Sequence, residues 1–414
     1  MIINTAGEYT LQYTATDACG NSTTVERDLL VEGPPRTVLY TDGTFIINER
    51  QRDIEANIAA HGQPTNIYAP LSNPAPYVYT AGSQRPWDSQ KSNITSVEIG
   101  STIYPTDISF WFYGFNNCTS MNLSKLNTSN VTNMTSVFNG CKALSSLDVS
   151  NFDTSSVTRM ISMFYDCHAL TTLDLSNFNT GSVTSMSSMF GFCKSLTSLN
   201  LRNFNTSAVE NMSNMFYHCD LLATLDISNF DTHLVTTMQQ MFSECKSITS
   251  LDLSSFNTSA VENMSSMFNN CELLTTLDLS GFSTNNVNTM TSMFNNCKAL
   301  ETLDISGFNT SSVTKMDSMF TYCQKLKTLD LSSFDTSLVT TMYRMFQQCY
   351  ILETIYASAS FVVTQVTNSN DMFKWMSTNL VGGAGTVWSS SYIDKTRAKI
   401  DGGTSDPGYF TARS

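Results

Sequence analysis

Apolar and polar positions recur along this chain with a period of 26 residues. One phenylalanine marks each period, and the same order of positions follows it in every unit. After Phe178, the residues Val183, Met186, Met189 and Cys193 come at intervals close to one helical turn, which predicts one face of a short helix. The marker phenylalanines are Phe152, Phe178, Phe204, Phe230, Phe256, Phe282, Phe308 and Phe334.

Each unit ends in alternating leucines, which predict a strand with one buried face. Leu173 and Leu175 in LTTLDLSNF are an example. A strand and a helix in 20–29 residues, with the pattern L-x-x-L-x-L, are typical of leucine-rich repeats. One unit cannot bury both faces, so neighbouring units must stack. We therefore predict an α/β repeat solenoid of the leucine-rich-repeat type, with one short parallel strand and one short helix per 26-residue coil and with β-rich caps.

Two charged columns bear on the predicted stacking. The residue after the repeat cysteine alternates in sign over five units, and a second column does the same over three units. Residues that are far apart in sequence would face opposite charges once the coils stack. Such exposed pairs contribute only tenths of a kcal/mol, so their value is as a marker of register. The columns are Lys194, Asp220, Lys246, Glu272 and Lys298, and Glu301, Lys327 and Glu353.

The pattern divides the chain into four regions. Residues 1–35 alternate as two strands and are expected to form a β hairpin. Residues 36–107 are rich in proline, lack the 26-residue period and are expected to form a β-containing N-terminal cap. The solenoid is expected over 108–376, and 377–414 should close it as a C-terminal cap. Repeat arrays need atypical ends to cover their apolar end faces.

Charge and hydropathy exclude several classes of partner. The chain has 22 basic and 35 acidic residues, a net charge of −13, and no clustered Lys and Arg. This argues against binding to nucleic acid or to anionic lipid. No run of 18 apolar residues is present, so no membrane insertion is expected. The first residues lack the pattern of a signal peptide, and the last ones lack a lipidation signal.

A ladder of carboxylates is the main candidate for a ligand-binding face. The middle outward position of each strand is mostly aspartate, and Asn200 and Arg202 interrupt the column. Carboxylates about 5 Å apart repel by about 1 kcal/mol per pair in water, which a cation such as calcium or a basic partner would relieve. Alternatively, each aspartate bonds nearby Ser and Thr hydroxyls and stays solvated, and we favour this structural interpretation. The ligand-face residues are Asp148, Asp174, Asn200, Arg202, Asp226, Asp252, Asp278, Asp304 and Asp330.

Cysteine and histidine do not predict catalysis or a resident metal. Ten cysteines from Cys118 to Cys349 follow the repeat, and we expect them to be buried thiols, because their side chains would run parallel on one apolar face. The sequence contains no CxxC pair, which is typical of zinc sites, so zinc is not expected. His168 and His218 adjoin cysteines, but adjacent helical residues diverge too far to form a Cys–His pair, and His168 is expected to be solvated. No catalytic site or cofactor is expected.

The repeat unit and its flanking segments resemble a known family. The unit MFxxCxxLxxLDLSxFxTSxVTxM resembles the BspA-like leucine-rich repeats of bacterial surface proteins, and IDGGTSDPGYFT and RTVLYTDGTFIINER resemble the flanks of such arrays. The resemblance covers roughly residues 36–414. Residues 1–35 resemble the last strands of a bacterial immunoglobulin-like module, which implies that the chain is part of a longer polypeptide. The family implies a cell-surface or extracellular location and a role in adhesion.

Two functional hypotheses follow from the repeat. The first is a non-enzymatic, adhesin-like binding module that presents a Ser/Thr/Asp-lined sheet to an extracellular protein or glycan of a host or a neighbouring cell. Many weak aligned contacts add along such a face. The alternative is a structural spacer or stalk that displays an upstream domain, which the near-uniform coils favour.

Overall fold

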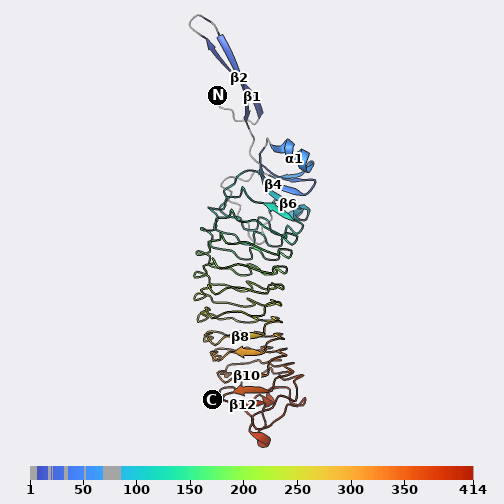
Figure 1. The fold of residues 1–414 in the computed structure, drawn as a ribbon, viewed down its shortest axis with the longest axis vertical. Helices are drawn as coiled ribbons and strands as arrows, with labels where there is room; N and C mark the ends of the chain where they lie inside the picture. Colours follow the sequence, from blue (N-terminus) through green and yellow to red (C-terminus); the bar gives the residue numbers. More distant parts are fainter. Residues whose placement is uncertain are drawn as a thin grey trace.

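The protein is an elongated stack of coils with an N-terminal cap at one end and short C-terminal strands at the other (Figure 1). The computed structural model describes residues 7–16, 20, 22–31, 36–50, 53–68 and 85–413. Cys19 and part of the proline-rich segment of the expected N-terminal cap lie outside the described residues. No helix in the described part of the chain is long and apolar enough to cross a membrane.

The first two strands form a separate antiparallel hairpin. β1 (Gly7–Thr16) pairs with β2 (Ser22–Val31), so that Gly7 lies opposite Val31 and Thr16 lies opposite Ser22. The two alternating strands predicted in this region are therefore present. In Figure 1 the hairpin lies beyond the N-terminal cap.

The N-terminal cap joins the stack through a shared sheet. Its strand order is β5-β3-β4-β6-β7, where β3 spans Arg36–Tyr40, β4 Thr44–Glu49, β5 Pro64–Tyr68, β6 Ser96–Ile99 and β7 Ser120–Asn122. Helix α1 (Ile54–His61) and a 3₁₀ helix (Asp88–Asn93) connect these strands. Because β4, β6 and β7 pair in parallel, the cap continues the stack of coils in the same direction. The buried rings of Phe45, Trp87 and Phe115 cover the end of the core.

Parallel backbone bridges connect residues one period apart through the array. They link Asn133 to Arg159, Arg159 to Ser185, and so on at intervals of 26 residues as far as Thr341. The last step runs from Thr341 to Asn368 and is one residue longer, as is the interval from Phe334 to Phe361 in the sequence. The repeat-type fold predicted from the period is therefore present, with like positions aligned along the body.

The predicted helix in each coil is wrong. The segment that carries the methionines is a series of overlapping turns, and α1 is the one α-helix among the described residues. Backbone N–H groups alternate between two kinds of acceptor. One N–H donates to the carbonyl three residues back in its own coil, and the next N–H donates to a carbonyl of the following coil. In one coil, Met163, Tyr165 and Cys167 bond internally, whereas Met160, Ser162, Phe164 and Asp166 donate to Ser185, Ser187, Met189 and Gly191.

Two left-handed residues per coil make this turn geometry possible. In the same coil they are Ser162 and Asp166, with φ of 53° and 61°. An α-helix satisfies its backbone within one segment, but here the next coil offers carbonyl groups at hydrogen-bonding distance. The spacing of inward side chains suits both structures, so Met160, Met163 and Phe164 are buried as the periodicity predicts.

The predicted strand is present in only some coils. The C-terminal coils contain β8 (Thr276–Asp278), β9 (Thr302–Asp304), β10 (Thr328–Leu331) and β11 (Thr354–Ala357). In the coils that carry Asp148, Asp174 and Asp252, the same LDL-type segment does not form a regular strand. Its leucines still point inward: Leu173 is 6% exposed and Leu175 is 1% exposed. One short strand in every coil is therefore also incorrect.

Stacked phenylalanine rings form the centre of the core. Phe164 and Phe190 lie with ring centroids 5.8 Å apart and planes within 5°, and Phe190 stacks on Phe216 in the same way. Each ring is fully buried. Neighbouring coils therefore bury one another's apolar side chains, as a repeat architecture requires.

A second buried column consists of threonines that tie adjacent coils together. The Thr206 hydroxyl is 2.8 Å from the carbonyl oxygen of Asp231, to which it donates, and it accepts from the Asp231 N–H at 2.8 Å. Thr128, Thr154, Thr180 and Thr284 make the same pair of contacts with the next coil. At these corners the threonine hydroxyl thus supplies the hydrogen bonds that the main chain of the next coil would otherwise make to another main-chain group. We call this column the threonine ladder.

The ten cysteines from Cys118 to Cys349 are buried free thiols. From Cys141 onward each thiol donates to a carbonyl of an earlier coil, as Cys219 does to Phe190 at 3.2 Å, whereas Cys118 donates to Ser120. Burial raises the pKa of the Cys193 thiol to about 12, although a backbone hydrogen bond opposes the shift. The thiols are therefore protonated at neutral pH and serve as small core donors.

A carboxylate organises the C-terminal cap. Buried Asp401 accepts from the N–H groups of Ala384, Thr386, Gly403 and Gly408 and from the Thr386 hydroxyl. The chain then enters β12 (Phe410–Ala412), which pairs in parallel with β11. Phe410 packs edge-on against Phe361 at 4.9 Å, so the cap covers the last open face of the core.

Candidate binding face

The predicted carboxylate ladder runs along one surface of the stack, which we call the strand face. Asp148, Asp174, Asp226, Asp252 and Asp278 are exposed on it. Asn200, Arg202 and Asp304 are exposed as well, and Asp330 is partly buried. The structure therefore brings all nine predicted ligand-face residues onto a single surface.

Each aspartate of the ladder is held by its own coil. The Asp252 carboxylate accepts from the Ser254 N–H at 3.0 Å and from the Ser254 hydroxyl at 2.7 Å, and Asp304 bonds Ser306 in the same manner. These contacts fix the turn after the strand segment, which gives the aspartate a structural reason to recur. One oxygen, Oδ1, accepts both bonds, so the serine does not use Oδ2.

Hydrogen bonds also keep several aspartates of the ladder charged. The Ser254 hydroxyl and then its N–H hold the pKa of Asp252 below the ordinary value, and the Ser150 hydroxyl and N–H do the same for Asp148. The ordinary pKa is 3.8. These carboxylates are therefore ionised throughout the physiological range, and the strand face has a negative potential.

The interruption of the column at Arg202 forms a shallow depression. Arg202 is 74% exposed in its side chain, and its Nε donates to Asp226 Oδ2 at 2.9 Å. The partly apolar floor is formed by Leu199 and Leu225, and the volume is about 510 Å³. The lining brings together the predicted residues Asn200, Arg202, Asp226 and Asp252 with Ser198, Thr224 and Ser250.

A second arginine, which the sequence analysis missed, reaches the same face from the C-terminal cap. Arg413 Nη1 lies 2.8 Å from Asp330 Oδ2, and its guanidinium lies 5.0 Å from the centre of the Tyr356 ring. It borders a depression of about 540 Å³ with Asp278 and Asp304. Arg413 is outside the 26-residue period, and the pairing of β12 with β11 is what places it beside the ladder.

A smaller depression of about 230 Å³ lies between these two. Asp252 borders it as well as the depression at Arg202, and Leu251 and Asp278 border it as well as the depression at Arg413. The three hollows therefore adjoin along the stack. We call them together the strand-face groove, which runs from the coil of Asn200 to Arg413. Asp148 and Asp174 belong to the ladder but do not line the groove.

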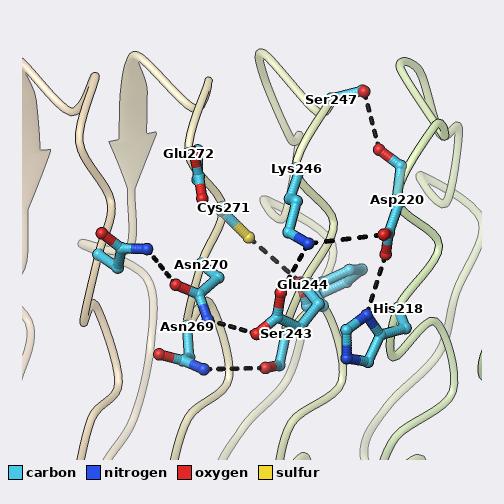
Figure 2. Close-up of polar contacts among 12 residues, drawn as sticks. His218, Asp220, Ser243, Glu244, Lys246, Ser247, Asn269, Asn270, Cys271 and Glu272 are labelled. Atoms are coloured by element: carbon cyan, nitrogen blue, oxygen red, sulfur yellow. Dashed lines mark hydrogen bonds and ion pairs between the residues drawn. The ribbon is translucent and has the colours of Figure 1, made fainter.

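The turn segments carry a different polar network on another surface of the stack (Figure 2). Lys246 Nζ lies 3.5 Å from Asp220 and 3.2 Å from Glu244, and Asp220 accepts a contact from the His218 ring at 3.0 Å. Asn270 extends the network by donating to Glu244. Lys246 bridges Asp220 of the preceding coil and Glu244 of its own coil, so the network helps to hold neighbouring coils together.

The charge columns show how far the predicted alternation holds. Lys246 contacts Asp220, and Lys298 contacts Glu272 at 3.0 Å, as opposite neighbours in stacked coils should. Lys194 instead lies with its Nζ 5.4 Å from the centre of the Phe192 ring. The prediction is correct for register and incomplete for pairing, because the partly buried ring of Phe192 competes for Lys194.

The two histidines that adjoin cysteines do not pair with a thiol, because the Cys167 and Cys219 thiols both donate to backbone carbonyls. His218 bonds Asp220, whereas the Cys219 thiol donates to a backbone carbonyl. His168 pairs with Asp166 and is half-buried, which corrects the expectation of a solvated side chain. Burial lowers the His168 pKa, although Asp166 opposes that shift. Within the described ranges, no group of three or more His, Cys, Asp or Glu side chains is arranged to hold a metal ion.

Comparison with known families identifies the repeat. A family model described as "Mycoplasma protein of unknown function, DUF285" matches residues 106–220, 192–302 and 273–381. Together these matches span well over half of the 414 residues. The chain belongs to the DUF285 family. Membership in DUF285 confirms the resemblance of the 26-residue unit to BspA-like bacterial repeats.

Other comparisons add little to the DUF285 assignment. A leucine-rich repeat protein from Eubacterium ventriosum is 16% identical to this chain, with a TM-score of 0.31, and the match covers 81% of this chain and 94% of that one. No curated protein matches the sequence.

Proposed function

We propose that this DUF285 protein is a non-enzymatic binding module that presents the strand-face groove to a protein partner at the cell surface. The observation that carries the proposal is the depression at Arg202. There the otherwise regular ladder changes to Asn200 and Arg202, and an exposed guanidinium adjoins carboxylates over a partly apolar floor. A repeat built only for support has no need of such a change in one coil.

The contacts of Arg202 support recognition in addition to stability. Its Nε bonds Asp226, and with 74% of the side chain exposed the terminal nitrogens face solvent. A guanidinium oriented by a carboxylate is prepared to bind a second acceptor. Serine and threonine hydroxyls around it can donate to or accept from a partner's main chain.

An enzymatic role finds no support in the ladder. Acid and base catalysis by two carboxylates requires environments that push their pKa values apart. Here serine hydrogen bonds lower the pKa of Asp148 and Asp252 alike. These two carboxylates are therefore not divided into acid and base roles.

The test is a binding screen of the full chain against extracellular matrix proteins, cell-surface proteins and glycans. We expect a protein ligand whose binding is weakened by Arg202→Ala. The matched control is Arg159→Ala, because Arg159 is exposed on the array but does not line the groove. A glycan ligand, or equal loss with both variants, would contradict the proposal. An array that binds nothing would favour a spacer that displays another domain.

A further inference from the structure

We infer that the strand-face groove binds an extended polypeptide segment in which two basic residues are flanked by two acidic residues, all at alternate positions. This inference rests on the proposed function and specifies the chemistry of the partner. It follows from the order of charges along the groove, from the spacing of the coils and from the composition of the lining.

The order of charges along the groove is cation, anions, cation. Arg202 stands at one end beside Asp226, and Arg413 stands at the other end beside Asp330. Between them lie three further carboxylates, those of Asp252, Asp278 and Asp304. No ion pair with these three aspartates is found among the described residues. The complementary ligand is therefore acidic at both ends and basic in the middle.

Spacing determines how such a ligand is built. Asp226 and Asp330 are four coils apart, and at about 4.8 Å per coil their separation along the stack is about 19 Å. An extended peptide rises about 3.3 Å per residue, so side chains at positions 1 and 7 are about 20 Å apart. Positions 3 and 5 of the same peptide point to the same side and lie about 7 Å apart, within the stretch of about 10 Å from Asp252 to Asp304.

The lining favours a peptide over a sugar chain. Stacking on a sugar needs an exposed ring, but the aromatic residues that line the groove, Phe256 and Phe282, are 5% and 3% exposed. The groove instead offers small hydroxyl groups, such as those of Thr276 and Thr302, next to leucine side chains. Hydroxyls that donate and accept suit the alternating N–H and C=O groups of an extended backbone.

Two peptides of identical composition test the order of charges. The matching peptide is Glu-Ser-Lys-Ser-Lys-Ser-Glu. In the reversed peptide, Lys-Ser-Glu-Ser-Glu-Ser-Lys, the Glu and Lys residues exchange places. Both peptides have blocked termini and zero net charge. Each exposed ion pair changes affinity by a factor of about two, so four correct contacts should give the matching peptide an advantage of at least fivefold. NMR titration of the full chain at low ionic strength measures the ratio, which should approach one in 1 M salt.

Charge reversal in the protein assigns the preference to the groove. Asp278→Lys should move the preference towards the reversed peptide, and Asp278→Asn, which keeps an acceptor for Ser280, should reduce it by about half on a logarithmic scale. Asp148→Lys is the matched control, because Asp148 is on the same ladder outside the groove and also bonds the serine two residues on. The preference of this variant should equal that of the wild type.

The outcomes separate this inference from the proposed function. Equal affinity for the two peptides, or an Asp148→Lys variant that shifts the ratio as much as Asp278→Lys, overturns the inference. If in that case a partner found by the screen still depends on Arg202, the proposed function stands. If the peptides are discriminated but no partner depends on Arg202, the charge order is correct and the proposed function fails.

Discussion

Removal of one hydroxyl from the threonine ladder should destabilise the array strongly. Thr206 is 1% exposed, and its hydroxyl bonds both the N–H and the carbonyl of Asp231, each at 2.8 Å. Thr206→Val keeps the shape of the side chain and leaves both main-chain groups without this partner. An unsatisfied buried group costs about 1–3 kcal/mol, so two groups at a partly solvated corner should lower the free energy of unfolding by about 2–4 kcal/mol.

Two control variants separate the hydroxyl from other effects. Thr206→Ser keeps the hydroxyl and loses one methyl group, so it should cost only about 1 kcal/mol. Thr172→Val makes the same chemical change at an exposed position and should stay within about 0.5 kcal/mol of the wild type.

Urea unfolding followed by circular dichroism measures these differences. Because repeat arrays unfold in a coupled manner, the three variants should be compared by transition midpoint and by slope. A Thr206→Val protein as stable as Thr206→Ser would refute the reasoning, since it would mean that Asp231 has no need of the hydroxyl.

Three further predictions concern the thiols, the turn-face charges and the C-terminal cap. Because burial raises the pKa of Cys193 to about 12, thiol reagents at pH 8 should label the array cysteines at least 100-fold more slowly in native protein than in urea, and fast native labelling would contradict this. Lys246→Ala should cost a few tenths of a kcal/mol, because the side chain is 40% exposed. Burial tends to lower the pKa of Lys246, but Glu244 and Asp220 raise it, so the difference from wild type should be complete below pH 10.5 and decline above it in pH-dependent melts. Asp401→Asn should cost about 2–3 kcal/mol in chemical denaturation. Burial tends to raise the pKa of Asp401, but its hydrogen bonds lower it well below 3.8. The stability advantage of the wild type over Asp401→Asn should therefore be full above pH 4 and shrink as the pH falls further. A stability difference that does not change with pH would contradict this prediction.

The period and the inward positions could be predicted from the sequence because they depend on the side chains of one coil. Met186, Met189 and Cys193 are buried in the array as their spacing indicates. The backbone between them could not be predicted in the same way. Intervals of three and four residues place side chains inward in a helix and also in the observed turns, and the choice depends on bonds to the next coil.

The candidate site was predictable where it follows the period and was missed where it does not. Asn200 and Arg202 break a regular column, so the sequence marks them as unusual. Arg413 reaches Asp330 only because β12 pairs beside β11, which is a contact of tertiary structure between segments that share no pattern. The buried role of Thr206 was missed for a related reason. Threonine after Asn or Asp is typical of a turn, and its bonds to the next coil appear only when the coils are stacked.

The threonine ladder also has a consequence for how the protein can change length. Each Thr hydroxyl recognises only the main chain of the following coil, so a duplication or deletion of 26 residues recreates the same junction at any point in the array. An insertion of another size would put a different residue at the corner and break the contact. Descendants of such a gene can therefore gain or lose reach in whole coils, and a change between the two arginines moves Arg202 nearer to or further from Arg413 without any new interface having to evolve.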